Sequence, residues 1–293
     1  MRGRYIGAAY QGTPVEYNDS NLNKKGIDGM VKLIASDIDG TLVPDGSDKL
    51  NPEIFDVIRK LKSQGIYFAV ASGRQWKSIE RLFYPVKDEI FFIAENGAYV
   101  GARGRALFTS PMKMGQIREI IHDVREIPDC DLMLSGRDML YTESKNQTFI
   151  DYLVLGYHNE VKQLDDLEQV EDTIIKASIY HRGYQAFEVA GKVMVPKWGD
   201  KLKVVTAGRE WLDMMEPDVN KGAALREIQE SLGILPEETM AFGDNLNDME
   251  LLAQAKYSYA IGNARQEIKD AANYIADTNV NDGVLKVLRT LIV

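Results

Sequence analysis

One stretch decides the fold: Val31-Lys32-Leu33-Ile34-Ala35-Ser36-Asp37-Ile38-Asp39-Gly40-Thr41. Its first six residues are mostly apolar and lead into an acidic turn with a glycine, which is typical of a buried parallel strand. Because alternate side chains of an extended strand point the same way, Asp37 and Asp39 can present both carboxylates to one side. Two carboxylates so close repel each other, and a divalent cation or a proton on one of them relieves the repulsion. A pair of solvated turn aspartates, or a helix cap, is the alternative interpretation.

Strands and helices alternate after this first strand. A helix begins at Asn51-Pro52, where the asparagine can cap it and the proline fits its first turn. Apolar strands follow at Ile66–Ala71 and Ile90–Ala94, with a helical pattern between them. The alternation predicts an α/β fold with a doubly wound, mostly parallel, Rossmann-like core. In such sheets the active site lies at the carboxyl ends of the strands, where these three strands meet polar turns that contain glycine.

The middle of the chain follows a different pattern. Between about residues 115 and 208, helical stretches mix with short strand-like runs, which predicts an inserted α+β unit. The doubly wound pattern resumes with a helix at Lys221–Leu232. We therefore expect a core made of residues 30–114 and 209–293, interrupted by a second unit at residues 115–208.

The composition excludes several classes of protein. A net charge of −9 argues against nucleic acid as the main partner, because binding to a phosphate backbone needs a basic face. No run approaches the roughly 20 apolar residues of a membrane span. Cys130 is the only cysteine, so no internal disulfide can form, which fits a cytoplasmic protein. Residues 1–29 lack the apolar segment of a secretory signal, and we expect a disordered or non-native extension there.

Three further motifs carry groups that suit phosphate chemistry. Ser72-Gly73-Arg74 follows a strand, and its N–H groups and hydroxyl could bind a phosphate oxygen, although a simple capping serine would look the same. Lys221 begins a helix, where its charge opposes the helix dipole, so either a nearby anion or plain solvation accounts for it. The run Gly243-Asp244-Asn245-Leu246-Asn247-Asp248 follows another strand and supplies oxygen ligands of the kind that Mg²⁺ prefers, unless it is only a polar capping loop.

Together these residues suit one reaction. A carboxylate attacks phosphorus poorly because both partners are anionic, and Mg²⁺ with a lysine neutralises that repulsion and stabilises charge in the transition state. Asp37 would form an aspartyl-phosphate, which splits the reaction into two easier steps. Asp39 would protonate the leaving alcohol and then act as a base toward water.

The four motifs resemble those of the haloacid dehalogenase superfamily, specifically the Cof-type phosphatases with a C2-type cap. The resemblance extends over roughly residues 30–293, and the matching segments are Asp37–Leu42, Ala71–Arg74, Asn220–Gly222 and Gly243–Asp248. It implies a magnesium-dependent phosphatase that hydrolyses phosphate monoesters of small metabolites, such as sugar phosphates. It also implies that the inserted unit is a cap that closes over the site and sets the choice of substrate.

The resemblance implies a role for each matching residue. Asp37 is the expected nucleophile and Asp39 the expected acid and base. Mg²⁺ would be bound by Asp37, by the main-chain carbonyl of Asp39 and by Asp244, with Asp248 supporting it, for example through a water molecule. The residues expected to hold the phosphate are Ser72, Gly73, Lys221 and, as an assisting group, Asn247. Arg74 could be structural or could face the substrate.

Other functions remain compatible with parts of this pattern. A phosphomutase or phosphotransferase would use the same aspartyl-phosphate but pass it to a sugar instead of water. A non-catalytic regulatory protein that binds a phosphorylated metabolite would be favoured by loss of the acidic or lysine residues, and these are present. The inserted unit offers candidate substrate contacts, each of which could equally be solvated or packed internally: Arg137, Tyr141, Lys176, Tyr180, Lys197 and Trp198.

Overall fold

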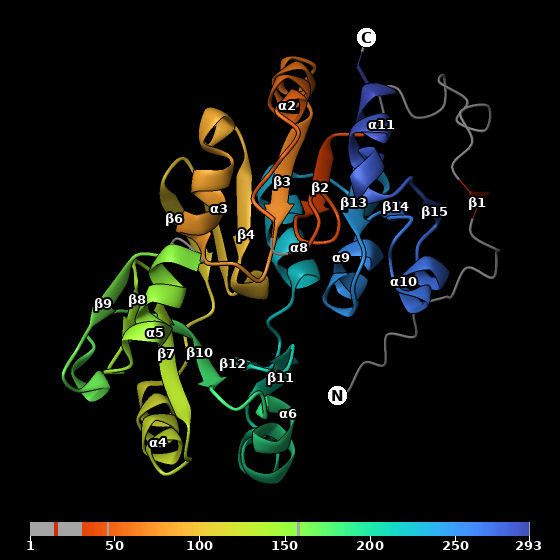
Figure 1. Ribbon diagram of the computed structural model, residues 1–293. Helices are drawn as coiled ribbons and strands as arrows, with labels where there is room; N and C mark the ends of the chain where they lie inside the picture. The colour runs from red at the N-terminus through yellow and green to blue at the C-terminus, as the bar shows by residue number, and fades with distance from the viewer. Residues whose placement is uncertain (1–14, 17–30, 46, 157–158, 293) are drawn as a thin grey trace, which may run out of the picture.

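The computed structural model describes residues 15–16, 31–45, 47–156 and 159–292 (Figure 1). Within these ranges the chain forms two sheets, each with its own helices. The expectation of a disordered or non-native extension at residues 1–29 lies outside the described residues, apart from a two-residue strand at Val15–Glu16. None of the helices in the described ranges has the length and apolar character needed to span a bilayer.

The larger sheet confirms the doubly wound α/β core. In spatial order its strands are β1 (Val15–Glu16), β15 (Tyr274–Ile275), β14 (Tyr257–Ala260), β13 (Thr239–Gly243), β2 (Leu33–Asp37), β3 (Tyr67–Ala71), β4 (Phe91–Ala94), β5 (Tyr99–Ala102) and β6 (Arg105–Thr109). The pairings from β1 to β4 are parallel, whereas β5 and β6 add an antiparallel hairpin at one edge. The chain order reverses beside β2, which is where ligand sites form in open α/β sheets.

Helices cover both faces of this sheet because successive strand residues point to opposite sides. On β2, Ile34 joins one buried apolar cluster, whereas Leu33 and Ala35 join another on the opposite face. The first cluster includes residues of α2 (Glu53–Ser63), α3 (Trp76–Leu82) and α11 (Gly283–Arg289). The second includes residues of α8 (Lys221–Leu232), α9 (Met249–Ala253) and α10 (Gln266–Ala271). Short 3-10 turns lie at η1 (Tyr84–Val86), η2 (Glu95–Gly97), η6 (Pro236–Glu238), η7 (Leu246–Asp248) and η8 (Asn279–Asn281).

Capping residues place the helices where the sequence predicts them. The Asn51 side chain accepts a hydrogen bond from the Glu53 N–H at 3.1 Å, although the helix itself starts at Glu53. Asn220 caps α8 by accepting from the Ala223 N–H at 2.7 Å, and Gly233 ends that helix in the left-handed conformation. The cap at Asn220 fixes Lys221 as the first residue of α8.

The second sheet belongs to the unit that interrupts the core, which we call the insert. Its strands, in spatial order, are β11 (Lys203–Ala207), β12 (Trp211–Met215), β10 (Ile174–His181), β7 (Cys130–Gly136), β8 (Leu140–Thr142) and β9 (Val161–Gln163). Helices and turns accompany it at α4 (Met114–Arg125), α5 (Gln147–Asp151), η3 (Tyr152–Gly156), η4 (Leu167–Gln169), α6 (Ala186–Val189), η5 (Ala190–Met194) and α7 (Val195–Trp198). In Figure 1 the insert lies below the core sheet, on the side toward which β3 points.

The β11–β12 hairpin bears on the boundary expected at residue 208. That position lies in the turn of the β11–β12 hairpin, where Gly208 has a φ of +74°. A glycine after a strand can mark either the end of a domain or the turn of a hairpin, because both positions often need the left-handed backbone conformation that glycine adopts. The sequence alone does not distinguish the two cases. Since β12 pairs with both β10 and β11, we propose that the insert ends after Met215.

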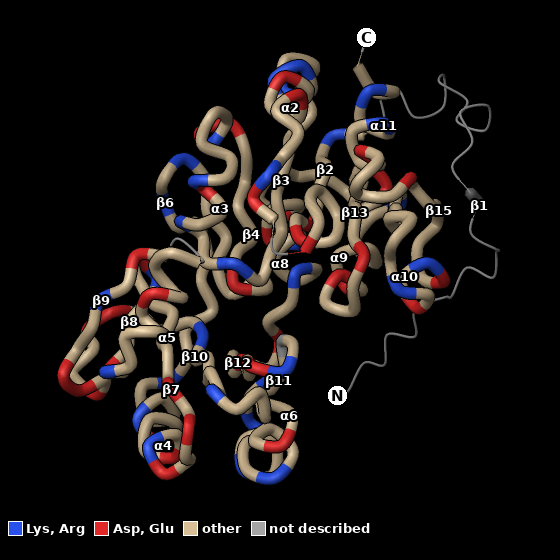
Figure 2. Tube along the Cα trace, in the orientation of Figure 1, with Lys and Arg blue, Asp and Glu red and all other residues tan. Residues whose placement is uncertain are grey.

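Charges of both signs are distributed over the two units. Figure 2 shows Lys and Arg interspersed with Asp and Glu along α2, α4, α6 and α10. One cross-link of this kind joins α11 to α2, where Arg289 makes two hydrogen bonds to the Glu53 carboxylate. Exposed pairs of this kind contribute little to stability because water and salt screen them, so the buried apolar clusters form the cores of the two units.

Candidate active site

Four neighbouring strands of the core end at the same edge of the sheet. Strand β2 ends at Asp37, β3 leads into Ser72, β4 into Glu95 and β13 into Asp244. These strands are adjacent and parallel in the order β13, β2, β3 and β4, so their carboxyl ends bring polar turns together. Residues separated by about 200 positions in sequence therefore share one site.

Lys221 lies between two of the carboxylates. Its Nζ is 2.5 Å from Asp37 Oδ1 and 2.6 Å from Asp248 Oδ1, and all three side chains are buried. Burial alone would lower the pKa of Lys221, but the charges of Asp248 and Asp37 outweigh it and raise that pKa. The ion pairs explain why a lysine occupies the start of α8, where the helix dipole disfavours a cation.

One ammonium group does not balance the acidic charge here. Asp37, Asp244 and Asp248 offer carboxylate oxygens that all lie within 4.8 Å of one another. Burial, followed by the charge of Asp248, raises the pKa of Asp37 well above its usual range. Burial also raises the pKa of Asp244 to about 6. Asp37 Oδ2 is buried and has no hydrogen-bond partner.

This donor set fits a hard divalent cation. A buried carboxylate oxygen without a partner costs free energy that a bound cation would relieve, and Mg²⁺ accepts carboxylate oxygens. Asp244 is held by the Thr41 hydroxyl, which donates to its Oδ1 at 2.9 Å. Both oxygens of Asp248 are already used, Oδ1 by Lys221 and Oδ2 by the N–H groups of Asp244 and Asn245. Asp248 therefore suits a supporting position behind Asp37 and Asp244.

Gly40 allows Asp244 to approach the end of β2. Its φ is +84°, a conformation that other residues rarely adopt. A Cβ atom built there would lie 2.6 Å from Asp244 Cγ and would overlap the carboxylate. The glycine in the acidic turn is thus required both by the backbone conformation and by the space that Asp244 occupies.

Asp39 pairs with Arg74 and is not part of the cluster formed by Asp37, Asp244 and Asp248. Arg74 Nε donates to Asp39 Oδ2 at 2.9 Å, and Nη2 donates to Oδ1 at 2.5 Å. Nη2 also donates to the Ser47 carbonyl at 2.9 Å, which holds the guanidinium in place. The Arg74 guanidinium thus binds a predicted site residue, and it also lines the cavity described below, so both roles that the sequence leaves open remain predictions.

The predicted phosphate-binding residues surround this pair. Ser72 is buried, and its hydroxyl accepts from the Arg74 N–H at 3.1 Å, which shapes the turn after β3. Gly73 packs closely on Asn96, since a Cβ there would lie 3.2 Å from the Asn96 amide atoms. Asn247 Nδ2 in turn donates to Asn96 Oδ1 at 3.1 Å. The turns after β3, β4 and β13 are therefore joined through Asn96, in the Glu95-Asn96-Gly97 turn that we expect to border the approach to the insert.

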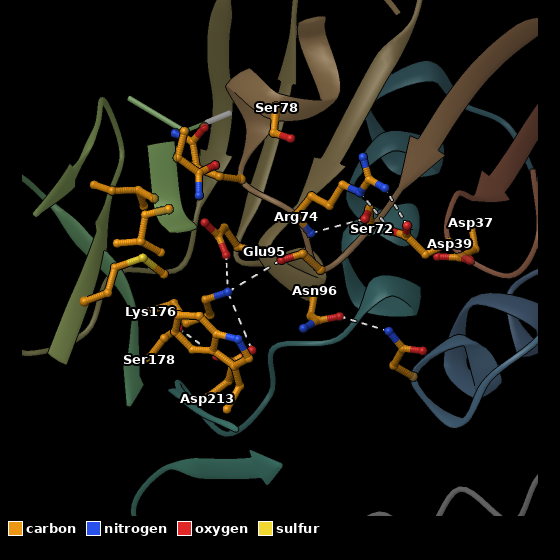
Figure 3. Close-up of a pocket in the computed structure, with 18 of the residues that line it drawn as sticks. Asp37, Asp39, Ser72, Arg74, Ser78, Glu95, Asn96, Lys176, Ser178 and Asp213 are labelled. Carbon is orange, nitrogen blue, oxygen red and sulfur yellow. Dashed lines mark hydrogen bonds and ion pairs between the residues drawn. The ribbon is translucent and has the colours of Figure 1, made fainter. Parts of the chain in front are cut away.

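A cavity of about 290 Å³ opens between these turns and the insert (Figure 3). Its core side includes Asp37, Asp39, Ser72, Gly73, Arg74, Glu95, Asn96 and Asn247. Its insert side includes Met133, Leu140, Leu153, Asn159, Lys176, Ser178, Trp211 and Asp213. Apart from Lys221, which lies behind Asp37, the residues predicted for catalysis and phosphate binding thus line the core side of a cavity whose other side is made by the insert.

Only one of the six insert residues suggested by the sequence lines this cavity, and it is Lys176. The others have contacts elsewhere: Arg137 with Asp138, Tyr141 with Asp172, Tyr180 with Phe149 and Trp211, and both Lys197 and Trp198 with Asp123. Ser178 and Asp213, which do line it, face each other across β10 and β12. Lys176 and Ser178 are two residues apart on β10, so the sequence indicates that they lie on the same face of that strand. That β12 pairs with β10 and brings Asp213 to Ser178 is known only from the fold.

Comparisons with known proteins place the chain among characterised relatives. Residues 34–288 match the model of a family described as haloacid dehalogenase-like hydrolase. The 5-amino-6-(5-phospho-D-ribitylamino)uracil phosphatase YbjI of Escherichia coli is 30% identical over 258 residues, covering 88% of this chain and 95% of that protein. YcsE of Bacillus subtilis, a phosphatase of the same name, is 26% identical with the same coverage. A structure from Eubacterium rectale superposes with a TM-score of 0.84 at 38% identity, covering 89% of this chain and 99% of its own.

Proposed function

Because this chain belongs to the haloacid dehalogenase-like hydrolase family and is a phosphatase, we propose that it is magnesium-dependent and hydrolyses phosphate monoesters of small metabolites. The observation that carries the proposal is the environment of Asp37. Asp37 lines the cavity, one of its oxygens is held by Lys221, and the other, Oδ2, is buried and has no hydrogen-bond partner among the described residues. Asp37 is therefore the carboxylate best placed to attack phosphorus, because it lines the cavity beside the Lys221 ammonium.

The first step is a transfer of the phosphoryl group to Asp37. Its oxygen forms a bond to phosphorus while the bond from phosphorus to the ester oxygen breaks, which leaves an aspartyl-phosphate and an alkoxide. The Lys221 ammonium, 2.5 Å from the attacking carboxylate, reduces its repulsion with the phosphate and stabilises negative charge on the phosphoryl group during transfer. Water then attacks the same phosphorus, which releases phosphate and restores Asp37.

Asp39 is the proposed acid and base of these two steps. It lines the cavity and is part-exposed, so its carboxyl group can give a proton to the departing oxygen. In the second step the same group takes a proton from the attacking water, which returns Asp39 to its starting state. The bidentate contact with Arg74 supports this role by fixing the direction of the carboxylate.

The phosphate would be held by groups at the ends of the strands. Ser72, Gly73 and Asn247 line the same end of the cavity as Asp37, and Lys221 supplies positive charge behind it. Mg²⁺ would be held by Asp37 and Asp244, with Asp248 behind them, and would supply further neutralisation of the phosphate charge when bound. Asp248 also holds Lys221 in place through the 2.6 Å contact.

The size of the cavity supports small substrates. A volume of about 290 Å³ lies at the lower end of the range for small-molecule sites and would enclose a phosphorylated metabolite of modest size. Two relatives bear the name of a phosphatase for 5-amino-6-(5-phospho-D-ribitylamino)uracil. We therefore include that compound with sugar phosphates among the substrates to be tested.

The test measures phosphate release from these compounds and from p-nitrophenyl phosphate, with Mg²⁺ and with a chelator. We expect release that requires the metal and is abolished by Asp37→Asn, a change of similar volume that removes the attacking oxygen's charge. The matched control is Asp56→Asn, an exposed aspartate on α2 that pairs with Arg59. Undiminished release by the folded Asp37→Asn protein, or release that ignores the chelator, would contradict the proposal.

A further inference from the structure

A buried charge cluster joins the insert to the core at the end of the cavity opposite Asp37. Lys176 of β10 makes an ion pair with Glu95, which follows β4, and its Nζ is 3.6 Å from Asp213 Oδ2 of β12. The Ser178 hydroxyl donates to the other oxygen of Asp213 at 2.6 Å. Figure 3 shows these side chains converging on Lys176 from both units. All four residues line the cavity.

The ammonium of this cluster is occupied by its own carboxylates. Lys176 and Glu95 are 5% and 1% exposed, so water screens their attraction very little. Burial alone would lower the pKa of Lys176, but Asp213 and Glu95 more than compensate and raise it, so the lysine stays charged. The carboxyl groups of Glu95 and Asp213 thus surround a single ammonium, and burial raises the pKa of Glu95.

Arg74, the other cationic side chain of the cavity among the described residues, is also paired with a carboxylate. Among the described residues that line the cavity, the cationic side chains are Arg74 and Lys176, and Arg74 is held by Asp39. The rest of the insert side includes the apolar groups Met133, Leu140, Leu153 and Trp211. A second anion on a substrate would lose its water here and find carboxylates in place of a cation, which is costly.

We propose that the insert end of the cavity selects phosphate monoesters whose leaving group is uncharged or cationic, and that Asp213 determines this specificity by excluding a second anionic group. The inference rests on the proposed phosphatase function and narrows its substrate class. Asp213 and Ser178 offer acceptors to hydroxyl or ammonium groups, while the phosphate is bound at the far end by Asp37 and its neighbours. Discrimination by a like charge across a desolvated site is a general route to specificity.

Three compounds with related six-carbon skeletons test the charge preference. They are glucosamine 6-phosphate, glucose 6-phosphate and 6-phosphogluconate, which are cationic, neutral and anionic away from the phosphate. Each is measured as a competitive inhibitor of p-nitrophenyl phosphate hydrolysis, so that none needs to be turned over. We expect 6-phosphogluconate to bind at least about tenfold more weakly than glucosamine 6-phosphate, because a like charge at close range costs more than 1.4 kcal/mol. Equal or tighter binding of 6-phosphogluconate overturns the inference.

A charge-removing variant identifies the residue responsible. Asp213→Asn keeps the shape and a hydrogen-bond acceptor for Ser178, and we expect it to reduce the discrimination between the same two compounds about tenfold. The matched control is Asp165→Asn, which makes the same charge change on the insert at a fully exposed side chain outside the cavity. A melting curve shows whether Asp213→Asn folds, and the wild-type comparison decides the inference if it does not.

The outcomes separate this inference from the function on which it rests. If wild-type protein hydrolyses p-nitrophenyl phosphate but binds the three compounds equally, the charge preference is wrong and the phosphatase mechanism stands. If Asp165→Asn reduces discrimination as much as Asp213→Asn, the effect comes from overall charge and Asp213 is not the determinant. If p-nitrophenyl phosphate is not hydrolysed at all, the proposed function fails and the inference fails with it.

Discussion

Arg74 holds Asp39 by two hydrogen bonds, from Nε to Oδ2 at 2.9 Å and from Nη2 to Oδ1 at 2.5 Å. The two aspartates of the acidic turn thereby have different partners, since Asp37 contacts the buried Lys221 ammonium at 2.5 Å. A guanidinium binds both oxygens of a carboxylate and fixes its plane, whereas an ammonium binds as a point charge. Asp39 is therefore oriented, while Asp37 keeps one oxygen without a hydrogen-bond partner.

The first prediction concerns that orientation. Arg74→Lys keeps the positive charge but cannot make the two-point contact, so Asp39 should lose its fixed direction. Because small displacements of catalytic groups cost up to about 100-fold in rate, we expect kcat for p-nitrophenyl phosphate to fall roughly 10- to 100-fold. The pH profile of kcat should also shift, since the acid and base group has a new partner.

Arg59→Lys is the matched control for Arg74, because Arg59 makes an exposed ion pair with Asp56 on α2. It should leave both kcat and its pH profile unchanged. A normal rate and profile for Arg74→Lys would mean that the two-point contact does not position Asp39.

The second prediction separates the two chemical steps. Asp39→Asn removes the group that would activate water, so the aspartyl-phosphate on Asp37 should break down slowly and accumulate. Intact-mass spectrometry after mixing with p-nitrophenyl phosphate, whose leaving group needs little protonation, should detect one added phosphoryl group. Asp37→Asn combined with Asp39→Asn is the control, and a phosphoryl group on that double variant would place the nucleophile elsewhere.

The third prediction concerns the space beside Asp244. Gly40→Ala introduces a methyl group that would overlap the Asp244 carboxylate, and it also strains a backbone with a φ of +84°. Gly65→Ala has nearly the same strain, with a φ of +81°, but nothing within 4 Å of the added methyl. Both should lower the free energy of unfolding by about 1–3 kcal/mol, as such backbone strain usually does.

Only the substitution at Gly40 should also weaken Mg²⁺ binding, measured by titration calorimetry and by the metal concentration needed for half-maximal rate. Equal metal affinity in both alanine variants would show that the position of Asp244 does not depend on Gly40.

The fourth prediction concerns the single thiol. Burial, assisted by Asp131, raises the pKa of Cys130 to about 11. The thiol is neutral below that pH, so the reactive thiolate should increase as the pH rises toward 11. At pH 8 the thiolate fraction would be on the order of 100-fold below that of an ordinary cysteine, whose pKa is about 8.5. Labelling with a disulfide reagent over a pH series checks this, and rapid labelling at pH 8 would contradict it.

Much of the core could be predicted because its signals are local. Apolar runs of strand length, each ending in a polar turn, gave β2, β3, β4 and β13 within one or two residues at each end. The parallel arrangement then followed from the alternation with helices. Asp37 and Lys221 are 184 positions apart, yet their meeting could be expected because both belong to segments that end or begin at the same edge of the sheet.

The parts that could not be predicted depend on pairings between distant strands. The hydrogen bond between Ser178 and Asp213 requires the register of β10 against β12, which no local pattern encodes. Our proposal that the insert ends after Met215, in place of the expected residue 208, depends in the same way on the pairing of β12. Arg74 has several possible partners in sequence, and only the fold brings its guanidinium onto Asp39.

The cavity lies between two parts of the chain, the core and the insert, which come from different segments of the sequence. Its phosphate end comes from turns that follow core strands, and its other end from strands of the insert. Substitution of insert residues can therefore change which substrates fit the cavity, while the groups proposed to react, which belong to the core, stay unchanged. Selection, or a protein engineer, can explore new substrates on this scaffold by changing lining residues of β7, β8, η3, β10 and β12.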